Sequence, residues 1–413
     1  MSAQPNPAPA AADAVAVQPL KLALIDPSLF TLPYDAKLAT ALAEVGHAVT
    51  FYGKALGTGE TAPGIETLRQ IFYPEVVRWG LERWPAPLTK IAKGALHARA
   101  MRRLLGALRQ DPPDIIHFQW LPLPAVDRAF IDPLRRIAPL VLTAHDSRPF
   151  NANPGSALQN LGATAILRRF DRVIVHTEQA RRRLLDYGVA EDRLAKIAHG
   201  FLHDEDAAPT PPPADHTGAA LRFLLFGKVK PYKGVDVVIE AMRQMAPEDR
   251  ARCRVDVVGK PYMDVAPLVQ AASGLGDCLR FDFRFVADNE LASLMARADI
   301  LLFPYREIDM SGVLMTGLRA TRPVVASNIG GFAELLENGR HALLVPPADP
   351  AALSAAMARL VREPAIRHRL SKGISTLVAG IPSWREIALR TSAVYSAALR
   401  ASATPSRSSV AGP

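Results

Sequence analysis

The sequence predicts an α/β protein built from two doubly wound domains, each with a largely parallel sheet. Short apolar segments typical of buried strands alternate with amphipathic helical segments, and this alternation favours parallel sheets. The length of 413 residues is too great for one ordinary core and suits two domains of about 180 residues each. A proline-rich segment at residues 203–218, HDEDAAPTPPPADHTG, has no hydrophobic periodicity and is predicted to link the two halves.

The first domain is expected to span residues 19–202. An amphipathic helix is predicted at residues 34–45, ending at Gly46, and strands are predicted at 20–25, 48–52, 114–118, 140–144, 172–176 and 194–198. Residues 1–18 are rich in Ala and Pro and lack the basic segment of a signal peptide. We expect them to form a disordered tail.

Four predicted strands of this domain run into a histidine, namely His117, His145, His176 and His199. In an open parallel sheet the ligand crevice lies outside the carboxyl ends of the strands, which favours a common cleft for these side chains. A histidine at a strand end can also serve structure alone, by holding a loop through a hydrogen bond. Both interpretations stay open. The sequence lacks the close His and carboxylate spacing of a metal site, so we expect no metal.

The second domain is expected to span residues 219–380, followed by a segment at 381–400 and a disordered tail at 401–413. Helices are predicted at residues 235–245, 288–296 and 313–320, and strands at 222–226, 254–258, 279–283, 300–303 and 323–327. Two doubly wound domains that face one another create a deep interdomain cleft, and such clefts hold ligands.

A loop at residues 227–234, GKVKPYKG, is predicted to bind an anion at a strand end. Lys228 and Lys233 can neutralise a diphosphate as point charges, while the glycines allow close approach of the backbone. A solvated lysine loop is the alternative. The sequence contains neither a Walker loop nor a G-x-G-x-x-G fingerprint after its first strand, which removes the main support for kinases and nicotinamide-dependent oxidoreductases.

A second anion site is predicted within residues 304–334. Ser311 and Gly312 precede the helix at 313–320, so their backbone N–H groups would lie at the positive end of its dipole. Gly330 and Gly331 indicate a tight turn. An ordinary helix and strand of an α/β domain is the alternative interpretation of this segment.

The net charge of +9 is concentrated partly in residues 90–109, a predicted helix with one basic face and an apolar stripe of Met101, Leu104, Leu105 and Leu108. Such a helix either lies on an anionic membrane surface or exposes a solvated face from its own domain. Nucleic acid is not an expected partner, because no aromatic-interleaved basic motif accompanies the charge. Two cysteines form no disulfide framework and indicate a reducing cytoplasm.

Several motifs together resemble the retaining glycosyltransferases of family four, over nearly all of residues 20–400. They are GKVKPYKG, SGVLMTGLRATRPVVASNIGGFAELLENGRHALLVPPAD and SWREIALRTSAVYSAALR in the second half, and TAHDSRP and FDRVIVHTEQARRRLL in the first. The resemblance implies the GT-B fold, with two Rossmann-like domains around an interdomain cleft. It places a nucleoside-diphosphate sugar on the second domain and the acceptor on the first, and it makes the segment 381–400 a helix that returns to the first domain.

The resemblance also implies the site residues. The donor diphosphate would contact Lys228 and Lys233, together with Ser311, Gly312 and Val313 at the helix start. His145 is the acceptor-side catalytic candidate, with Asp146 beside it. Glu334 is a candidate donor-side contact, with a structural charge at a helix start as the alternative.

The family's Glu-x7-Glu motif falls on Ile308 and Thr316, so both glutamates are replaced in this sequence. Glu307 or Asp309 can replace the first glutamate by a shift of one residue. Thr316 keeps a hydroxyl that can bond a ribose, without the charge of a glutamate. These positions complete the predicted donor site.

The implied reaction is hexosyl transfer with retention of anomeric configuration, from a nucleoside-diphosphate sugar to a glycan or lipid-linked acceptor. A role in cell-surface polysaccharide or glycolipid biosynthesis is the associated expectation, in the cytoplasm or at the inner membrane face, with neither cofactor nor metal. Two alternatives stay open. The replaced glutamates are compatible with a catalytically degenerate subunit that binds a nucleotide sugar, and the same fold supports a sugar-nucleotide epimerase.

Overall fold

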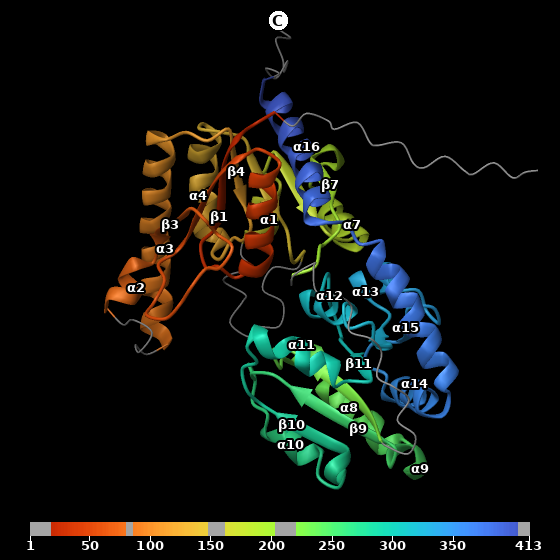
Figure 1. Cartoon of the computed structure of the whole chain (residues 1–413). Coiled ribbons are helices and arrows are strands. Elements are labelled where there is room, and N and C mark those ends of the chain that lie inside the picture. Colours follow the sequence, from red (N-terminus) through yellow and green to blue (C-terminus); the bar gives the residue numbers. More distant parts are fainter. Residues whose placement is uncertain (1–17, 80–85, 148–161, 203–219, 404–413) are drawn as a thin grey trace, which may run out of the picture.

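The computed structural model describes residues 18–79, 86–147, 162–202 and 220–403 as two α/β domains, one above the other in Figure 1. The predicted fold class is confirmed. The predicted linker at 203–218 and nearly all of the two predicted tails lie outside the described residues.

The N-terminal domain contains a seven-stranded parallel sheet in the order β3-β2-β1-β4-β5-β6-β7. Its strands are β1 (Lys21–Asp26), β2 (Ala48–Lys54), β3 (Leu68–Phe72), β4 (Ile115–Phe118), β5 (Leu140–Thr143), β6 (Arg172–Val175) and β7 (Leu194–Lys196). Leu22 pairs with Val49 on one side and with Ile115 on the other, so the strand order reverses between β1 and β4. A ligand crevice is expected at this switch point, outside the carboxyl ends of the strands.

Helices cover both faces of this sheet. They are α1 (Leu32–Glu44), α2 (Pro74–Trp79), α3 (Ala86–Gln110), α4 (Pro124–Arg135), α6 (Ala163–Leu167) and α7 (Glu178–Asp186). The face that carries Ala23 and Ile25 of β1 packs against α3, α4, α6 and α7. The opposite face, with Leu22 and Leu24, packs against α1 and the last helix of the chain.

The C-terminal domain contains a six-stranded parallel sheet in the order β10-β9-β8-β11-β12-β13. Its strands are β8 (Leu221–Phe226), β9 (Cys253–Val258), β10 (Leu279–Asp282), β11 (Ile300–Phe303), β12 (Val324–Ser327) and β13 (Ala342–Val345). Its helices are α8 (Val235–Gln244), α9 (Pro247–Arg250), α10 (Ala266–Ala271), α11 (Asp288–Ala296), α12 (Gly312–Leu318), α13 (Gly330–Leu335), α14 (Pro350–Arg362) and α15 (Pro364–Ala379). Phe223 and Leu225 of β8 contact the core with α8 and α14, whereas Leu224 belongs to the core with α11, α12 and α13.

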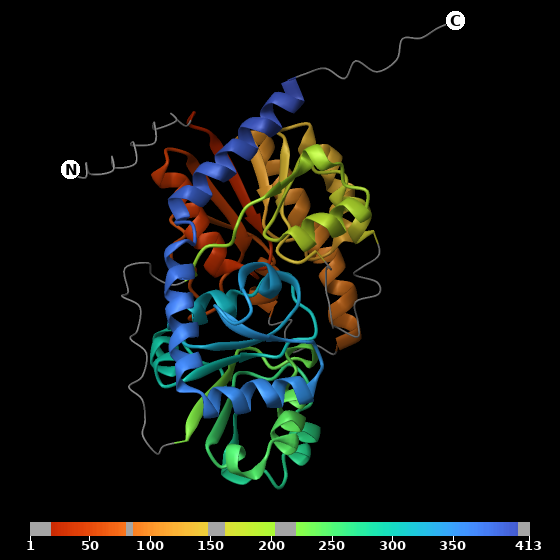
Figure 2. The same ribbon diagram turned by 90° about the vertical axis from the view of Figure 1, so that its right-hand side faces the viewer.

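The last helix, α16 (Trp384–Ala403), leaves the C-terminal domain and lies along the N-terminal domain beside α1, as Figure 2 shows. Ile387 and Tyr395 of α16 are fully buried in the same core as Leu22. Trp384 Nε1 donates a hydrogen bond to the Phe201 carbonyl at 2.5 Å. The predicted returning helix is confirmed, and it ties the end of the chain to its beginning.

Two predicted features take a different form in the structure. Gly330 and Gly331 begin helix α13 instead of forming a separate turn, and Gly330 has a φ of +47°. A Cβ on Gly331 would lie 2.4 Å from the Asp309 carbonyl oxygen, so glycine is required there by close backbone approach. The predicted tight turn was wrong, because both glycines belong to helix α13.

The basic helix α3 uses its apolar stripe inside the domain. Met101, Leu104 and Leu108 are fully buried in the core of the N-terminal domain, whereas Arg102 and Arg109 are exposed. The stripe therefore contacts protein, which favours the second of the two interpretations of this helix. In the ranges that the structure describes, every helix is too short or too polar to cross a lipid bilayer.

Candidate active site

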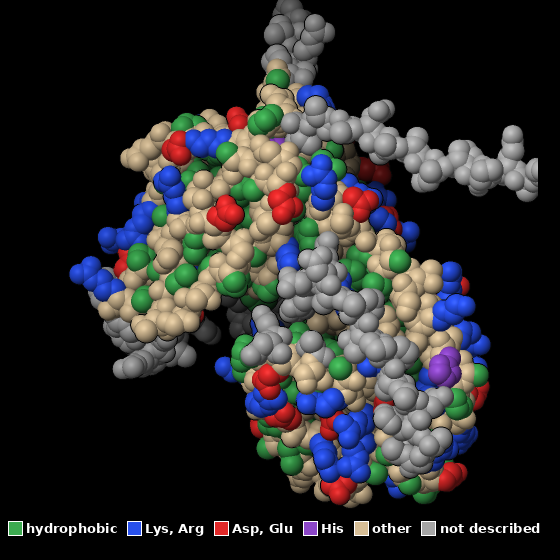
Figure 3. All heavy atoms as spheres, in the orientation of Figure 1, with side chains coloured by type: hydrophobic (Ala, Val, Ile, Leu, Met, Phe, Trp, Pro, Cys, Tyr) green, Lys and Arg blue, Asp and Glu red, His purple; other side chains and the backbone are tan. Residues whose placement is uncertain are grey.

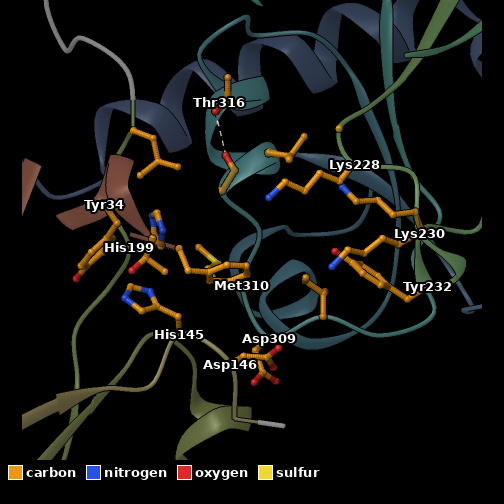
Figure 4. A pocket seen from close by; sticks show the side chains of 18 of the residues that line it. Tyr34, His145, Asp146, His199, Lys228, Lys230, Tyr232, Asp309, Met310 and Thr316 are labelled. Atoms are coloured by element: carbon orange, nitrogen blue, oxygen red, sulfur yellow. Dashed lines mark hydrogen bonds between the residues drawn. The ribbon is translucent and has the colours of Figure 1, made fainter. Parts of the chain in front are cut away.

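A cavity of about 770 Å³ lies between the two domains, lined from both sides by loops at or near the carboxyl ends of the strands. The space-filling view shows the molecule hollowed at this boundary (Figure 3). The predicted interdomain cleft is therefore present. Figure 4 shows His145 and His199 entering it from one side and Lys228 from the other.

Lys233 is the most buried cation of the cavity wall. The 3₁₀ turn Pro231–Lys233 follows β8, and its last side chain is 3% exposed. Its ammonium group donates a hydrogen bond to Tyr305 Oη and lies 4.5 Å from the centre of the Tyr305 ring. Burial, together with the charges of Lys230 and Lys228, lowers the pKa of Lys233 to about 7. A bound anion would restore the charge that burial disfavours.

Lys228 lies at the cleft among exposed aromatic rings. Its Nζ is 5.5 Å from the centre of the Phe30 ring, which belongs to the other domain, and 5.7 Å from that of Tyr262. Lys230 and Lys260 also lie 5.9 Å from the Tyr262 ring. Burial and the charge of Lys230 lower the pKa of Lys228. The wall of the C-terminal domain is thus strongly positive, as expected of an anion site.

A glycine keeps the two predicted anion-binding segments close together. Gly227 has a φ of +111°, and a Cβ at this position would lie 3.0 Å from Lys233 Nζ and 3.2 Å from Val313 Cγ2. The lysine loop and the start of α12 therefore face one another across a gap that only glycine leaves open. Gly312, Val313 and Thr316 of α12 line the cavity.

Ser311 lies directly before helix α12, as the sequence predicts, but it is not among the residues that line the cavity. Ser311 is the N-cap of α12, and its Oγ accepts a hydrogen bond from Leu314 N at 3.1 Å. The residue is buried and lies behind the cavity wall formed by Gly312 and Val313. Its contribution is to hold the start of the helix, whose first N–H groups have no intrahelical partner.

Thr316 faces the cavity, but its hydroxyl is already engaged. Its Oγ1 donates a hydrogen bond to the Gly312 carbonyl at 3.0 Å, drawn as a dashed line in Figure 4. The lone pairs of this oxygen can still accept a hydrogen bond. The predicted contact stays a prediction.

Three of the four strand-end histidines meet in the wall of the N-terminal domain. His145, His176 and His199 line the cavity around Tyr34, whose ring centre is 4.6 Å from that of His145. His176 Nδ1 lies 3.0 Å from the Ile197 carbonyl and donates to it, while its Nε2 lies 3.3 Å from His145 Nδ1. In neutral His176, Nε2 is therefore the acceptor for the His145 ring.

Burial keeps these rings neutral. It lowers the pKa of His145 well below its usual value, helped by the neighbouring His176, His199 and His117 rings, and it lowers the pKa of His176 to about 4. Burial and His176 also lower the pKa of His199 to about 3. The wall thus presents neutral imidazoles rather than charged acids, and His145 Nε2 lies 3.3 Å from Gln119 Oε1.

His117 has the structural role that was the alternative. It is fully buried below the cavity, with Nδ1 2.7 Å from Tyr395 Oη and Nε2 2.8 Å from Thr143 Oγ1. Nδ1 thus attaches helix α16 to strand β4, and Nε2 joins β4 to the neighbouring strand β5. His117 does not line the cavity.

Asp146 and Glu307 lie in the cavity wall from opposite domains. Both act on the same ring, because burial and then the charges of Asp146 and Glu307 raise the pKa of Tyr232 to about 12. Tyr232 is therefore close to both carboxylates. The predicted candidates His145, Asp146 and Glu307 are brought to one cavity with Lys228 and Lys233.

Asp309 and Glu334 are engaged by the N-terminal domain. Asp309 forms an ion pair with Arg183, and Glu334 accepts hydrogen bonds from the backbone of Glu178 and Gln179. Glu334 lies outside the cavity wall, whereas Asp309 is part of it. The predicted donor contacts of these two carboxylates stay predictions, but the structure gives both another partner.

Several wall residues were missed from the sequence. Arg183, Tyr262, Phe30 and Trp120 line the cavity, and the Phe30 and Trp120 rings stack with centres 4.6 Å apart. Phe30 is 54% exposed and Tyr262 53%, but these exposures are known only from the structure, so no signal in the sequence indicated either residue. Among the described residues, no group of three or more His, Cys, Asp or Glu side chains is arranged to hold a metal ion.

Models of two glycosyltransferase families match the two domains. "Glycosyltransferase Family 4" matches residues 36–204, and "Glycosyl transferases group 1" matches residues 220–363. Together they cover most of the chain, and their boundary falls at the predicted linker. Each domain is thus recognised independently of the other.

Relatives and solved structures agree along the whole chain. A D-inositol 3-phosphate glycosyltransferase of Geodermatophilus obscurus is 29% identical, over 92% of this chain and 87% of its own. Anabaena HepE, solved in complex with UDP-glucose, has a TM-score of 0.70 at 18% identity, over 91% of this chain and 99% of its own. Sucrose-phosphate synthase of Thermosynechococcus elongatus also has a TM-score of 0.70, at 21% identity, over 92% of this chain and 99% of its own.

The two family models, the full-length relatives and the paired parallel sheets around one cleft lead to the same result. The chain belongs to the family 4 and group 1 glycosyltransferases and is a glycosyltransferase with the GT-B fold.

Proposed function

We propose that this glycosyltransferase moves a sugar from a nucleoside-diphosphate sugar to an acceptor hydroxyl with retention of anomeric configuration. The observation that carries the proposal is the convergence of Lys228, Lys233 and the start of α12 on one side of the cleft, opposite His145 on the other. A diphosphate fits the first wall and a polyhydroxyl compound the second.

In this scheme the bond between the anomeric carbon and the diphosphate oxygen breaks, and its electron pair stays on that oxygen. Lys228, Lys233 and the N–H groups of Gly312 and Val313 would stabilise the developing charge. The acceptor hydroxyl forms the new bond on the same face of the sugar, and its proton passes to the departing phosphate. His145 would hold a sugar hydroxyl by a hydrogen bond, beside Asp146. The lysines supply the positive charge, so the scheme needs no metal.

We propose a UDP-sugar as the donor, because HepE binds UDP-glucose with the same fold. A thermal-shift screen of UDP-, GDP- and ADP-sugars tests this, since a ligand that binds only the folded state raises its stability. UDP-sugars should raise the midpoint most. If a GDP- or ADP-sugar raised the midpoint more than the UDP-sugars, the proposal of a UDP-sugar donor would be wrong.

The acceptor has two candidate classes. The name of the relatives favours a soluble inositol phosphate, and the sequence resemblance favours a glycan or lipid-linked acceptor of cell-surface polysaccharide or glycolipid biosynthesis. The two acceptor classes are separated by an assay of UDP release with the donor that the screen identifies. The assay is run once with D-inositol 3-phosphate and once with membrane lipid extract as the acceptor. Proton NMR of the product then reports the anomeric configuration, and an epimerised donor in the absence of acceptor would contradict transfer. Donor binding without transfer to either acceptor would leave the alternative of a degenerate subunit.

We propose that contact with an anionic membrane, where it occurs, is electrostatic. Arg102 and Arg109 of α3 are exposed, while the apolar stripe of the helix is used in the core. Sedimentation with phosphatidylserine vesicles at low and high salt tests this. Arg102→Glu/Arg109→Glu should abolish binding, and salt-resistant binding would exclude the electrostatic mode. Such a contact would place the enzyme at the inner face of a membrane.

A further inference from the structure

Two carboxylates of the C-terminal domain hold helix α7 of the N-terminal domain. Asp309 Oδ1 pairs at 2.8 Å with Nη1 of Arg183, which lies in the second turn of α7. Glu334 accepts the backbone N–H groups of Glu178 and Gln179 at 2.6 and 2.7 Å, at the first turn of the same helix. These two contacts join the domains on one side of the cleft.

Asp309 makes a contact that Glu334 does not make. Its Oδ2 accepts a hydrogen bond from Ser147 N at 2.5 Å, and Arg183 Nη1 also donates to Ser147 Oγ at 2.5 Å. Asp309, Arg183 and Ser147 therefore form a closed set of three mutual contacts. Ser147 directly follows His145 and Asp146, so this set fixes the backbone one residue beyond them.

The three contacts are shielded from water, which makes their geometry demanding. Ser147 is 1% exposed and Asp309 8%, and both side chains of the ion pair are largely buried. A desolvated carboxylate is stable only when its lone pairs are satisfied by donors in good geometry. Displacement of the Ser147 amide would leave Asp309 Oδ2 without that donor, so the segment 145–147 is held in one place.

Asp309 is in turn anchored within its own domain. Its carbonyl oxygen accepts a hydrogen bond from Gly331 N at 2.7 Å, at the start of α13. Its neighbours Ile308 and Met310 line the cavity, so the same loop forms part of the cleft wall. Figure 4 shows Asp309 beside Asp146 at the boundary between the domains.

We propose that Asp309, together with Arg183, is a positioning residue of the transfer reaction rather than a donor ligand. It sets the place of the segment 145–147, and hence of His145 and Asp146, relative to the diphosphate site on the other domain. The inference rests on the proposed role of His145 and Asp146 at the reacting centre. Transfer requires the reacting groups to be aligned, and a misplacement of about 1 Å can cost about 100-fold in rate.

Asp309→Asn is the variant that tests this, because it keeps the shape of the side chain and removes the charge that Arg183 requires. The kinetic measurement is UDP release from UDP-glucose with the acceptor that the wild type uses, together with the Kd of UDP by calorimetry. We expect kcat to fall at least tenfold while the Kd of UDP changes less than twofold, since Lys228 and Lys233 are untouched. An unchanged kcat would overturn the inference.

Two controls separate positioning from domain docking. Glu334→Gln weakens the other contact to α7 without touching the segment 145–147, and Asp249→Asn removes a buried carboxylate that pairs with Arg362 within the C-terminal domain. Asp249→Asn should keep kcat within threefold of the wild type, and the loss of kcat in Glu334→Gln should be smaller than that in Asp309→Asn. If kcat fell as much in Glu334→Gln as in Asp309→Asn, the effect of Asp309 would come only from holding the two domains together and not from positioning the segment 145–147. The double variant Asp309→Asn/Arg183→Gln should lose no more than either single variant, and additive losses would refute a shared role.

NMR spectroscopy tests the same inference without measuring transferase activity. The ring signals of His145, assigned by their loss in His145→Gln, should shift in Asp309→Asn and remain unchanged in Glu334→Gln and Asp249→Asn. Unchanged His145 signals in Asp309→Asn would overturn the inference by themselves. A wild type without transferase activity would refute the proposed function instead, and the NMR comparison would still decide whether Asp309 places the segment.

Discussion

Lys233 donates a hydrogen bond to Tyr305 Oη, and its ammonium lies 4.5 Å from the centre of the Tyr305 ring. The ring and the hydroxyl hold a buried cation at the base of the cleft until an anion enters. Because Tyr305 is itself fully buried, the lysine has little freedom to leave this position. The amino group is therefore in position before the donor binds, and the bound anion favours its charged form.

Removal of this charge should slow transfer. Lys233→Ala is expected to lower kcat/KM about 100-fold, because one preorganised donor to a developing anion contributes about 3 kcal/mol. UDP release from the donor measures the effect. Lys372→Ala, on an exposed face of α15, is the matched control and should behave as the wild type. Equal activity in Lys233→Ala would contradict the proposed mechanism.

Donor binding should weaken as the pH rises through about 7. The pKa of Lys233 is lowered to about 7 in the free protein, and a bound diphosphate raises it. Because the complex binds the proton more tightly, affinity is fully present below pH 7 and falls about tenfold per pH unit above it, until the pKa of the complex is reached. Calorimetry with UDP-glucose, which has no ionisation near neutrality, measures this, and Lys233→Met should remove the dependence. The prediction requires protons to be taken up when UDP-glucose binds, so proton release on binding would contradict it.

His145 should matter for transfer more than for donor binding. His145→Ala is expected to lower kcat about 100-fold, the scale for one hydrogen bond aimed at the reacting region. The Kd of UDP should stay within twofold, because the diphosphate site belongs to the other domain. His368→Ala, on helix α15, is a control of the same residue type. A parallel loss of UDP affinity would place His145 in the donor site instead.

Gly234 should be required for folding of the C-terminal domain. It has a φ of +71°, and a Cβ there would lie 2.0 Å from the Pro304 carbonyl oxygen, so Gly234→Ala should lower the free energy of unfolding by more than about 3 kcal/mol. Gly274 has a φ of +89° in open space, so Gly274→Ala isolates the backbone strain at about 1 kcal/mol. Urea unfolding followed by circular dichroism measures both. If both variants lowered the free energy of unfolding by the same amount, the predicted clash of the Gly234→Ala side chain with Pro304 would be wrong.

Metal removal should leave the rate of transfer unchanged. Lys228 and Lys233 supply the positive charge that a divalent cation supplies elsewhere. The measurement is UDP release before and after dialysis against EDTA, with and without added Mg²⁺ or Mn²⁺. A rate that falls on chelation and returns with metal would show that the lysines are insufficient.

Much of the fold could be predicted from local patterns. The strands at the centre of each sheet are apolar on both faces, as in β5 (LVLT) and β11 (ILLF), and were located to within about two residues. The edge strand β3 (LRQIF) was missed because Arg69 and Gln70 are exposed there and break the apolar pattern. An edge strand is defined by its partner more than by its own sequence.

The site divides in the same way. Lys228 and Lys233 lie in a short loop and Gly312 begins α12, and the local sequence there indicates an anion site, so the half of the site on the C-terminal domain could be predicted. The contact between Arg183 and Asp309 joins residues 126 positions apart, and that of Gln179 with Glu334 joins residues 155 apart. Both depend on how two separately folded domains meet, which no local pattern encodes. The cleft was predicted, whereas the contacts that close it were not.

The path of α16 has a consequence for synthesis of the chain on the ribosome. Leu22 and Leu24 lie near the start of the chain, yet Ile387 and Tyr395, which cover them, are translated almost last. The part of this apolar face that α1 does not cover thus stays exposed while the second domain is made, and exposed apolar surface invites aggregation. Chains interrupted before residue 384 should therefore depend on chaperones that bind hydrophobic segments, even though both sheets are complete.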